Sequence, residues 1–229
     1  MLARGGAMPC EHCHCFLGGL QTPEDFQPEL YQAGVTLFEQ GDPVHAGFIV
    51  CKGAVQLEER TAQGSRVILK FLGASDSLID EALSDYTKHQ VAAQTVRDSQ
   101  IIRLPRASLL RMLSESPHLC QRMVLELARQ YTFWIRRLVI ALDGDLGVCE
   151  RLALALLDLS STLGIHTSEG LLIDLELNSQ QWADYVGCRR QTISQAFSNL
   201  EKREWIERRG KRVLLKDVEA LKQFVRPYI

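Results

Sequence analysis

The chain lacks the long hydrophobic runs that would place it in a membrane or direct it out of the cell. None of the apolar runs in its 229 residues reaches the roughly 18 residues that a membrane-spanning helix needs. Residues 1–6 do not open onto the apolar core of about 7–15 residues that marks a secretory signal. We therefore expect a cytoplasmic protein that has no membrane partner.

Signatures of the common enzyme classes are also missing. The six histidines are scattered, and there is no Gly-x-Ser-x-Gly motif, no P-loop and no dinucleotide-binding glycine pattern. We find neither an internal repeat nor a low-complexity stretch. The sequence predicts a protein that is not an enzyme.

What is present is the composition of a folded, soluble protein with uneven charge. Hydrophobic residues make up 46% and charged residues 24%, and the length suits two domains. Residues 178–229 contain 11 Lys/Arg and 6 Asp/Glu, whereas the rest of the chain contains 15 and 22. This asymmetry favours a C-terminal region that meets a polyanion, although a basic solvated surface would have the same composition.

Residues 29–116 have the pattern of a β-rich domain, which follows an N-terminal segment at 1–28. Short apolar runs at 35–38, 47–50, 54–57, 67–71 and 101–104 alternate with turns that contain glycine, among them Lys52-Gly53. Strands of this length and spacing predict an antiparallel roll in an α+β protein.

The hydrophobic period then changes to that of a long helix at 117–143. Apolar side chains follow a 4-3 spacing over three heptads, which predicts a seam that packs against a second copy of the helix. The alternative is that the helix packs on its own roll. The predicted dimer contacts are Val124, Leu127, Tyr131, Trp134 and Leu138.

Residues 147–229 are predicted to form a separate C-terminal domain. A helix is expected from 147 to 163, and the alternation at 173–177 predicts a short strand. Asn178 or Ser179 then caps a helix whose apolar face includes Trp182, Ala183 and Val186. Gly187 follows this helix, where a tight turn needs a positive φ.

The next helix carries its apolar residues at Ile193, Phe197 and Leu200, so its other face is polar. Arginine and glutamine can make paired hydrogen bonds to guanine and adenine in the major groove. This is the pattern of a helix-turn-helix that binds double-stranded DNA. The polar candidates are Arg189, Arg190, Gln191, Thr192, Ser194 and Gln195.

Residues 201–216 complete the motif with a predicted basic hairpin that turns at Gly210. Such a wing can hold the phosphate backbone beside a recognition helix. Its candidate DNA contacts are Lys202, Arg208, Arg209 and Lys211. An ordinary helical hairpin with a charged face is the alternative, and a dimeric interaction protein that does not bind DNA is the alternative function.

Three of the seven cysteines, Cys10, Cys13 and Cys15, lie within six residues. A reducing cytosol argues against disulfides, and clustered thiolates are strong ligands for iron–sulfur clusters, Zn²⁺ or Cu(I). Exposed thiols of lowered pKa could instead serve a redox sensor, or the tail could be unstructured and its thiols incidental. Cys51, Cys120, His12 or His14 could complete a metal site.

The order of roll, long helix and winged helix-turn-helix, together with the motif at 186–194, resembles the CRP/FNR superfamily of bacterial regulators. The resemblance covers the chain from about Glu29 onward. It implies a homodimer on a palindromic operator, RNA polymerase as a further partner, and Arg190, Gln191, Ser194 and Gln195 facing bases. Many members have Glu and Arg where this chain has Gln191 and Gln195, so their usual half-site does not transfer, and Gln suits adenine.

The resemblance is closer to the FNR branch than to the cyclic-AMP branch. No arginine occupies the phosphate-binding position near Thr87-Lys88-His89-Gln90, so cyclic AMP is not expected. The FNR branch holds an oxygen-sensing [4Fe–4S] cluster on cysteines before its roll, which implies the same for Cys10, Cys13 and Cys15. Their spacing is tighter here, and the fourth family ligand falls near Ile102, which is not a cysteine. A small-molecule ligand in the roll is the alternative signal.

Overall fold

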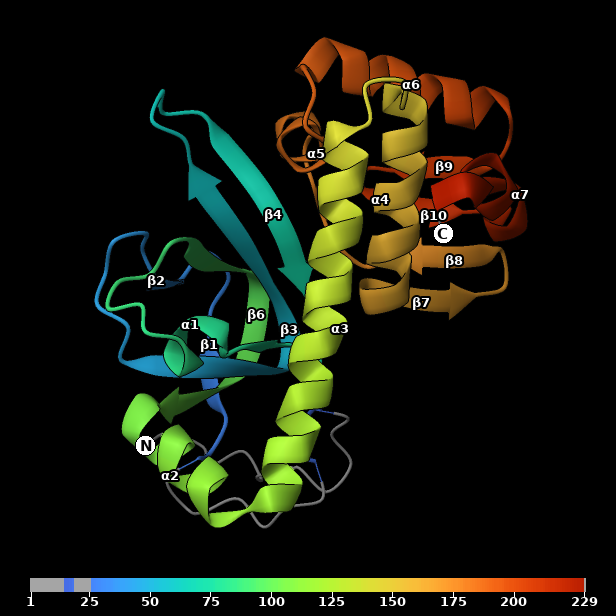
Figure 1. Cartoon of the computed structure of the whole chain (residues 1–229). Coiled ribbons are helices and arrows are strands. Elements are labelled where there is room, and N and C mark those ends of the chain that lie inside the picture. Colours follow the sequence, from blue (N-terminus) through green and yellow to red (C-terminus); the bar gives the residue numbers. More distant parts are fainter. Residues whose placement is uncertain (1–14, 19–25, 229) are drawn as a thin grey trace. The chain divides into compact units, whose positions relative to one another are not determined.

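A computed structural model describes residues 15–18 and 26–228 of the chain. It has the predicted α+β class, with an antiparallel sheet, helices and a C-terminal helix-turn-helix (Figure 1). Contacts divide the chain into two compact units: residues up to 59 with 72–131, and residues 60–71 with 132–229. In the described ranges, no helix is long and apolar enough to cross a membrane.

An antiparallel sheet forms the first unit. Strand β6 is central to it, since β6 pairs with β1, β2 and β3, while β5 pairs with β3. The strands are β1 (Glu29–Tyr31), β2 (Thr36–Phe38), β3 (Ala46–Arg60), β5 (Ser77–Leu78) and β6 (Ala92–Pro105).

Strand β3 is one continuous strand that covers both predicted strands at 47–50 and 54–57. Gly53, which the sequence pattern places in a turn, lies inside it with a φ of +104°. A Cβ on Gly53 would lie 2.5 Å from the Cα of Ser99, and the pairing with β6 shifts register on both sides of Lys52. The glycine is therefore needed for a bulge with close backbone approach, not for a hairpin turn.

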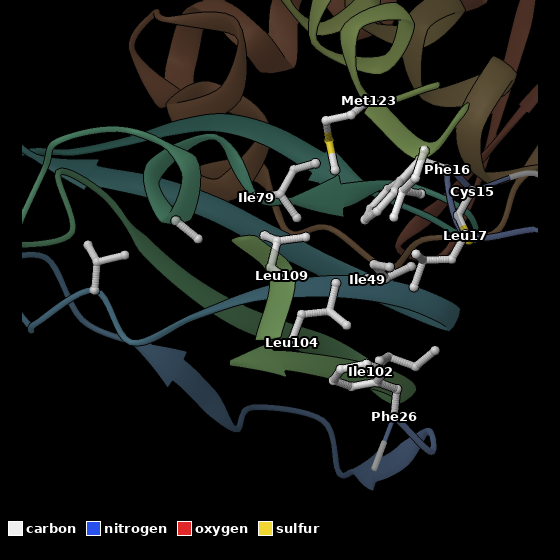
Figure 2. Close-up of a cluster of buried hydrophobic side chains, with 13 residues drawn as sticks. Cys15, Phe16, Leu17, Phe26, Ile49, Ile79, Ile102, Leu104, Leu109 and Met123 are labelled. Atoms are coloured by element: carbon white, nitrogen blue, oxygen red, sulfur yellow. The ribbon is translucent and has the colours of Figure 1, made fainter. Parts of the chain in front are cut away.

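The core of this unit lies where the sheet meets three helices (Figure 2). Ile49 of β3 and Ile102 of β6 are completely buried, as is Leu109 of α2. Met123 of α3 packs into the same cluster. The helices are α1 (Asp80–Leu83), α2 (Arg106–Glu115) and α3 (Pro117–Leu142), so the predicted long helix is present.

The second unit contains the helix-turn-helix and a four-stranded sheet of order β7-β8-β10-β9. Helix α4 buries one face against the other helices of the unit, and its core residues include Leu152, Leu156 and Leu159. The elements are β4 (Arg66–Leu72), α4 (Val148–Leu163), β7 (Gly164–Thr167), β8 (Gly170–Ile173), α5 (Ser179–Val186), α6 (Arg190–Lys202), β9 (Ile206–Arg209), β10 (Arg212–Leu215), α7 (Val218–Phe224) and the 3-10 helix η2 (Arg226–Tyr228).

The predicted strand at 173–177 is wrong in its position. Strand β8 ends at Ile173, and residues 174–177 lie outside any strand although Ile173, Leu175 and Leu177 are buried in alternation. The backbone N–H groups of Asp174 and Leu177 donate to the carbonyls of Leu163 and Lys211 instead of to one neighbouring strand. Alternating burial therefore persists in a connection that enters α5.

Candidate nucleic-acid interface

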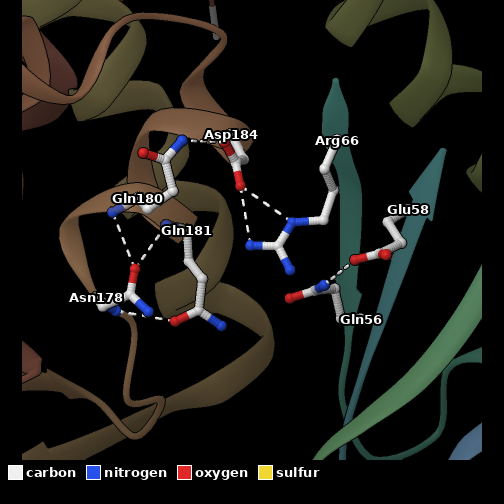
Figure 3. Close-up of polar contacts among 7 residues, drawn as sticks. All are labelled: Gln56, Glu58, Arg66, Asn178, Gln180, Gln181 and Asp184. Carbon is white, nitrogen blue, oxygen red and sulfur yellow. Dashed lines mark hydrogen bonds and ion pairs between the residues drawn. The ribbon is translucent and has the colours of Figure 1, made fainter. Parts of the chain in front are cut away.

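Helix α5 begins at a side-chain cap that the sequence predicted. The Asn178 side chain accepts hydrogen bonds from the backbone N–H groups of Gln180 and Gln181, at 2.9 and 3.0 Å. The Gln181 side chain accepts in return from the backbone N–H of Asn178, at 3.0 Å, which completes a capping box (Figure 3). Trp182, Ala183 and Val186 are buried, as the apolar pattern predicted.

The turn between α5 and α6 depends on Gly187. Its φ is +74° and its ψ is +50°, the left-handed conformation that the sequence predicted at this position. The N–H groups of Gly187 and Cys188 both donate to the Ala183 carbonyl, at 2.9 and 3.0 Å. A glycine in the left-handed conformation ends α5, and α6 begins three residues later at Arg190.

Helix α6 has one apolar face and one exposed polar face. Ile193, Phe197 and Leu200 are buried, and the Phe197 ring contacts the Trp182 ring edge-on at 5.2 Å between centroids. The outward positions are exposed, namely Arg189, Arg190, Gln191, Thr192 and Gln195. Ser194 is only half-buried, and its hydroxyl donates to the Arg190 carbonyl at 3.1 Å.

Two arginine pairs in this region differ in their partners. Arg189 and Arg190 have no ion pair with any described carboxylate. The wing arginines do: Arg208 makes paired hydrogen bonds to Glu201, at 3.0 and 2.7 Å, and Arg209 pairs with Glu169 and with Glu207. The sequence predicted all four arginines as DNA contacts.

The Glu201–Arg208 pair connects the recognition helix to the wing. The hydrogen bond from Arg208 lowers the pKa of Glu201, and the same bond raises the pKa of Arg208. The Arg208 guanidinium also lies over the Phe197 ring, 5.4 Å from its centroid. Arg208 therefore holds β9 against α6, which is a structural role in addition to the predicted DNA contact.

The wing turns as predicted, with Gly210 between β9 and β10 at a φ of +65°. Lys211 beside it is exposed and, like Lys202 at the end of α6, has no ion pair with a described residue. A groove of about 500 Å³ is lined by residues of the wing, α5 and α6, among them Arg190, Arg208, Lys211 and Arg212. Its cationic rim has the chemistry of a phosphate-binding surface.

Strand β4 supports α5 through an ion pair that the sequence did not predict. The Nε and Nη2 atoms of Arg66 donate to Oδ2 of Asp184, at 3.1 and 2.9 Å (Figure 3). Tyr185 is buried, its hydroxyl donates to Asp158 at 2.6 Å, and the Arg137 guanidinium lies 4.6 Å above its ring. Burial raises the pKa of Tyr185 well above its usual value.

Helix α3 exposes an apolar face that includes three of the five predicted dimer contacts. Val124, Tyr131 and Leu138 are exposed by 63, 67 and 53%, as a partner-facing residue should be before association. Leu127, however, packs against the core of its own unit, and Trp134 is half-buried with its ring edge-on to Phe133. Ile135 and Leu142 are also exposed, by 43 and 75%.

Two overlapping apolar series run along this helix. The sequence seam runs through 120, 127, 134 and 141, whereas 128, 135 and 142 continue the same 4-3 spacing on the exposed side of Val124, Tyr131 and Leu138. Both series are apolar, but Leu127 packs on the core of its own unit whereas Ile135 and Leu142 face outward. The sequence cannot separate two adjacent apolar stripes of one helix.

Of the three clustered cysteines, only Cys15 lies in the described residues; Cys10 and Cys13 lie outside them. Cys15 is 1% exposed and belongs to the core cluster of the first unit (Figure 2). Cys51, at the β3 bulge, packs against the same cluster. Cys120 instead directs its Sγ to the Leu113 carbonyl, at 3.0 Å.

Two side chains of the roll, His89 and Glu81, contact each other. His89 is 5% exposed, contacts the Glu81 carboxylate, and stacks on Phe38 with 3.7 Å between ring centroids. The other oxygen of Glu81 accepts from the Gln90 N–H at 2.6 Å.

Two domain families match the chain in the order that the sequence suggested. The cyclic nucleotide-binding domain matches residues 28–116, and the Crp-like helix-turn-helix domain matches residues 150–224. The chain belongs to the CRP/FNR family. It is a CRP-like DNA-binding transcription regulator.

Relatives and solved structures agree with this assignment. The chain is 26% identical to a CRP-like cAMP-activated global transcriptional regulator of Mycobacterium tuberculosis, over 86% of this chain and 88% of the relative. It is 28% identical to a global nitrogen regulator of Synechococcus elongatus, over 86 and 89%. FixK2 from Bradyrhizobium japonicum has the same fold, with a TM-score of 0.74 at 20% identity over 86 and 95%. These relatives are regulators by name.

Proposed function

We propose that the protein acts as a homodimer that reads a palindromic operator through α6 and the wing tip, and that redox state or oxygen, sensed at the N-terminal cysteines, controls this binding. The operator-reading part rests on one observation: the exposed face of α6 carries Arg190, Gln191 and Gln195 with no described carboxylate pairing to Arg190. These side chains are free to meet base edges.

Adenine is the base that this face fits best at two positions. The amides of Gln191 and Gln195 can each donate to N7 and accept from N6 of adenine, whereas Arg190 suits guanine. We expect a half-site that combines one guanine with neighbouring A·T pairs. Lys202 and Lys211 would contact phosphates and set the register.

The exposed face of α3 supports the homodimer. Ile135, Leu138 and Leu142 are exposed by 43, 53 and 75%, and a soluble helix rarely leaves such a stripe open to water. A second copy of the same stripe would cover it with coiled-coil geometry. Two recognition helices would then face successive major grooves, and RNA polymerase is the partner expected beside them.

The N-terminal signal is supported by how Cys15 is held. Phe16 and Leu17 are buried with Leu119 and Met123 of α3 in one cluster. Arg122 of α3 donates to the Cys15 carbonyl at 2.8 Å and also to the Gly18 carbonyl. A chemical change at the cysteines would therefore act directly on the first turns of the dimerisation helix.

An iron–sulfur cluster at the N-terminal thiols would take Cys51 as its fourth ligand. A [4Fe–4S] cluster is held by four Cys thiolates, and Cys51 packs against the buried cluster that contains Cys15. Cys51 follows Val50, and Val50 pairs with Ile101 of the neighbouring strand β6. Cys51 therefore lies on the strand next to Ile102, the position of the missing family ligand. When bound, a [4Fe–4S] cluster would supply sensitivity to oxygen. Cys10, Cys13, Cys15 and Cys51 would hold it.

Operator selection tests the DNA-binding part. The full chain is incubated with a random duplex library, bound duplexes are amplified, and the affinity of the selected operator is measured by fluorescence anisotropy at several salt concentrations. A palindrome bound more weakly as salt rises is expected. Failure to enrich any sequence, at low salt and with both oxidised and reduced protein, would contradict operator reading.

Anaerobic purification tests the signal. The wild type and the Cys51→Ser and Cys149→Ser variants are analysed for iron, sulfide and absorbance near 400 nm. We expect about four irons per chain in the wild type, as a [4Fe–4S] cluster requires, loss of iron in Cys51→Ser, and no change in Cys149→Ser. A wild-type chain that contains no iron would contradict the cluster, and iron retained in Cys51→Ser would contradict its fourth ligand.

Sedimentation velocity tests the dimer. Leu138→Asp places a charge in the exposed apolar stripe without touching the core, and we expect it to give monomers where the wild type gives dimers. Arg129→Asp is the control, since Arg129 lies on the same helix and, among the described residues, pairs only with Glu126. Equal association of all three proteins would exclude the stripe as the interface.

A further inference from the structure

A cavity of about 600 Å³ lies within the second unit. The last turns of α3, the length of α4, the end of α5 and the start of α7 line it. Most of its wall is apolar, including Phe133, Ile140, Leu154 and Val186. This volume and lining are typical of sites that bind small organic molecules.

The charges around the cavity are unbalanced in favour of cations. Arg136, Arg137, Arg151 and Lys222 line it, against the single carboxylate of Asp158. Asp158 already accepts from the Tyr185 hydroxyl, at 2.6 Å.

Two of these four cations have partners outside the cavity. Arg137 donates to the Tyr185 carbonyl at 3.0 Å and lies over the Tyr185 ring. Lys222 pairs with Glu219 at 2.7 Å. Arg136 and Arg151 remain, and neither has an ion pair with any described carboxylate.

Arg151 also has an unsatisfied donor. One end of its guanidinium, Nη1, donates to the Gly187 carbonyl at 3.3 Å, but its Nε is buried and has no hydrogen-bond partner among the described residues. A buried donor of a charged group is costly to leave unpaired. A carboxylate or sulfonate offers the planar or trigonal oxygens that such a guanidinium binds best.

A dimer partner would not fill this cavity. Successive residues of a helix turn by roughly 100°, so Phe133, Arg136 and Ile140 project from the side of α3 about 180° away from Tyr131, Leu138 and Leu142. The second copy is expected on the latter face. The cavity therefore remains open in the homodimer.

We propose that this cavity binds an organic anion with an apolar body, whose acidic group lies between Arg136 and Arg151 and whose body packs on Phe133, Leu154 and Val186. The inference goes beyond the DNA-binding function and does not depend on it. Through Arg151 such a ligand would also reach the Gly187 turn, which sets the direction of α6.

A matched pair of fluorescent probes tests the proposal on the full chain. 8-Anilinonaphthalene-1-sulfonate has an apolar body and a sulfonate, whereas N-phenyl-1-naphthylamine has the same body and no charge. We expect saturable 1:1 binding of the sulfonate, at least roughly tenfold tighter than that of the neutral probe, because a charge-assisted hydrogen bond contributes on this order. Equal affinity for the two probes would overturn the proposal.

Three variants locate the binding. Arg136→Ala and Arg151→Ala should each weaken the sulfonate about tenfold while leaving the neutral probe unchanged. Ser161→Trp, at an exposed position on the cavity wall, should exclude both probes. Arg129→Ala is the control for loss of an α3 arginine. Sulfonate binding unaffected by Arg136→Ala and Ser161→Trp would overturn the proposal, even if Arg151→Ala failed to fold.

Discussion

Two Arg-Arg pairs, Arg189-Arg190 and Arg208-Arg209, look alike in the sequence but differ in the structure. The first pair begins α6, faces outward, and meets no described carboxylate. The second pair lies in the wing, where Glu201, Glu207 and Glu169 hold both guanidinium groups. A basic composition therefore does not measure the charge available to DNA.

The difference follows from the neighbours of each pair in space. An arginine that already shares its hydrogen bonds with a carboxylate contributes little net positive potential, and it must break that pair to bind phosphate. In the wing, only the tip lysine, Lys211, is without such a partner among the described residues. The recognition helix and the wing tip should thus dominate binding, and the body of the wing should matter mainly for stability.

The largest expected effect is on Arg190. Arg190→Ala should weaken binding to the selected operator by about 5- to 150-fold, because a paired contact to guanine contributes roughly 1–3 kcal/mol. Anisotropy titration with the operator and with a random duplex measures this, and the loss should be greater for the operator. Arg226→Ala, an exposed cation outside the interface, is the control. Equal losses in the two arginine variants would remove Arg190 from base reading.

A smaller and less selective loss is expected at Lys211. Lys211→Ala should weaken the operator and the random duplex by similar factors, because a phosphate contact carries no sequence information. The slope of log K against log salt should fall in magnitude by about 1. A loss restricted to the operator would show that Lys211 reads bases.

The paired wing arginine should matter less still. Arg209→Ala should change DNA affinity by less than about twofold, because Glu207 and Glu169 already neutralise the side chain and exposed pairs are worth only about 0–1 kcal/mol. The same anisotropy titration applies. A loss as large as that of Lys211→Ala would break the distinction between the paired and unpaired cations.

The smallest effect is one of stability and depends on pH. Because Arg208 lowers the pKa of Glu201 in the folded state, their pair stabilises the protein above the unfolded pKa of Glu201, and this contribution is lost as the pH falls through the lowered, folded value. Glu201→Gln should reduce the free energy of unfolding by about 0.2–1 kcal/mol at pH 7, since the pair is partly exposed. The two proteins should converge in acid. Urea denaturation at pH 7 and in acid measures the difference in the free energy of unfolding between the two proteins. A difference that grows in acid would contradict a stabilising Glu201–Arg208 pair.

Local sequence patterns predicted those parts of the DNA-binding motif that depend on residues close together in the chain. Asn178, Gly187 and the 193-197-200 spacing each predicted a cap, a turn or a buried face because the controlling atoms lie within a few residues. The missed features involve distant partners. A glycine at position 53 is compatible with a hairpin turn and with a β-bulge. The close approach of the Ser99 backbone, which the sequence does not show, distinguishes the bulge from the turn.

The sequence by itself determined the order of roll, long helix and winged helix-turn-helix, since periodicity, capping and turn chemistry act over short distances. Tertiary structure decided which of two apolar stripes on α3 stays exposed, which arginines keep their charge free, and where Arg66 supports α5. The physical reason is that burial and ion pairing depend on atoms brought together from distant parts of the chain. The type of a residue does not specify which residues surround it in the folded protein.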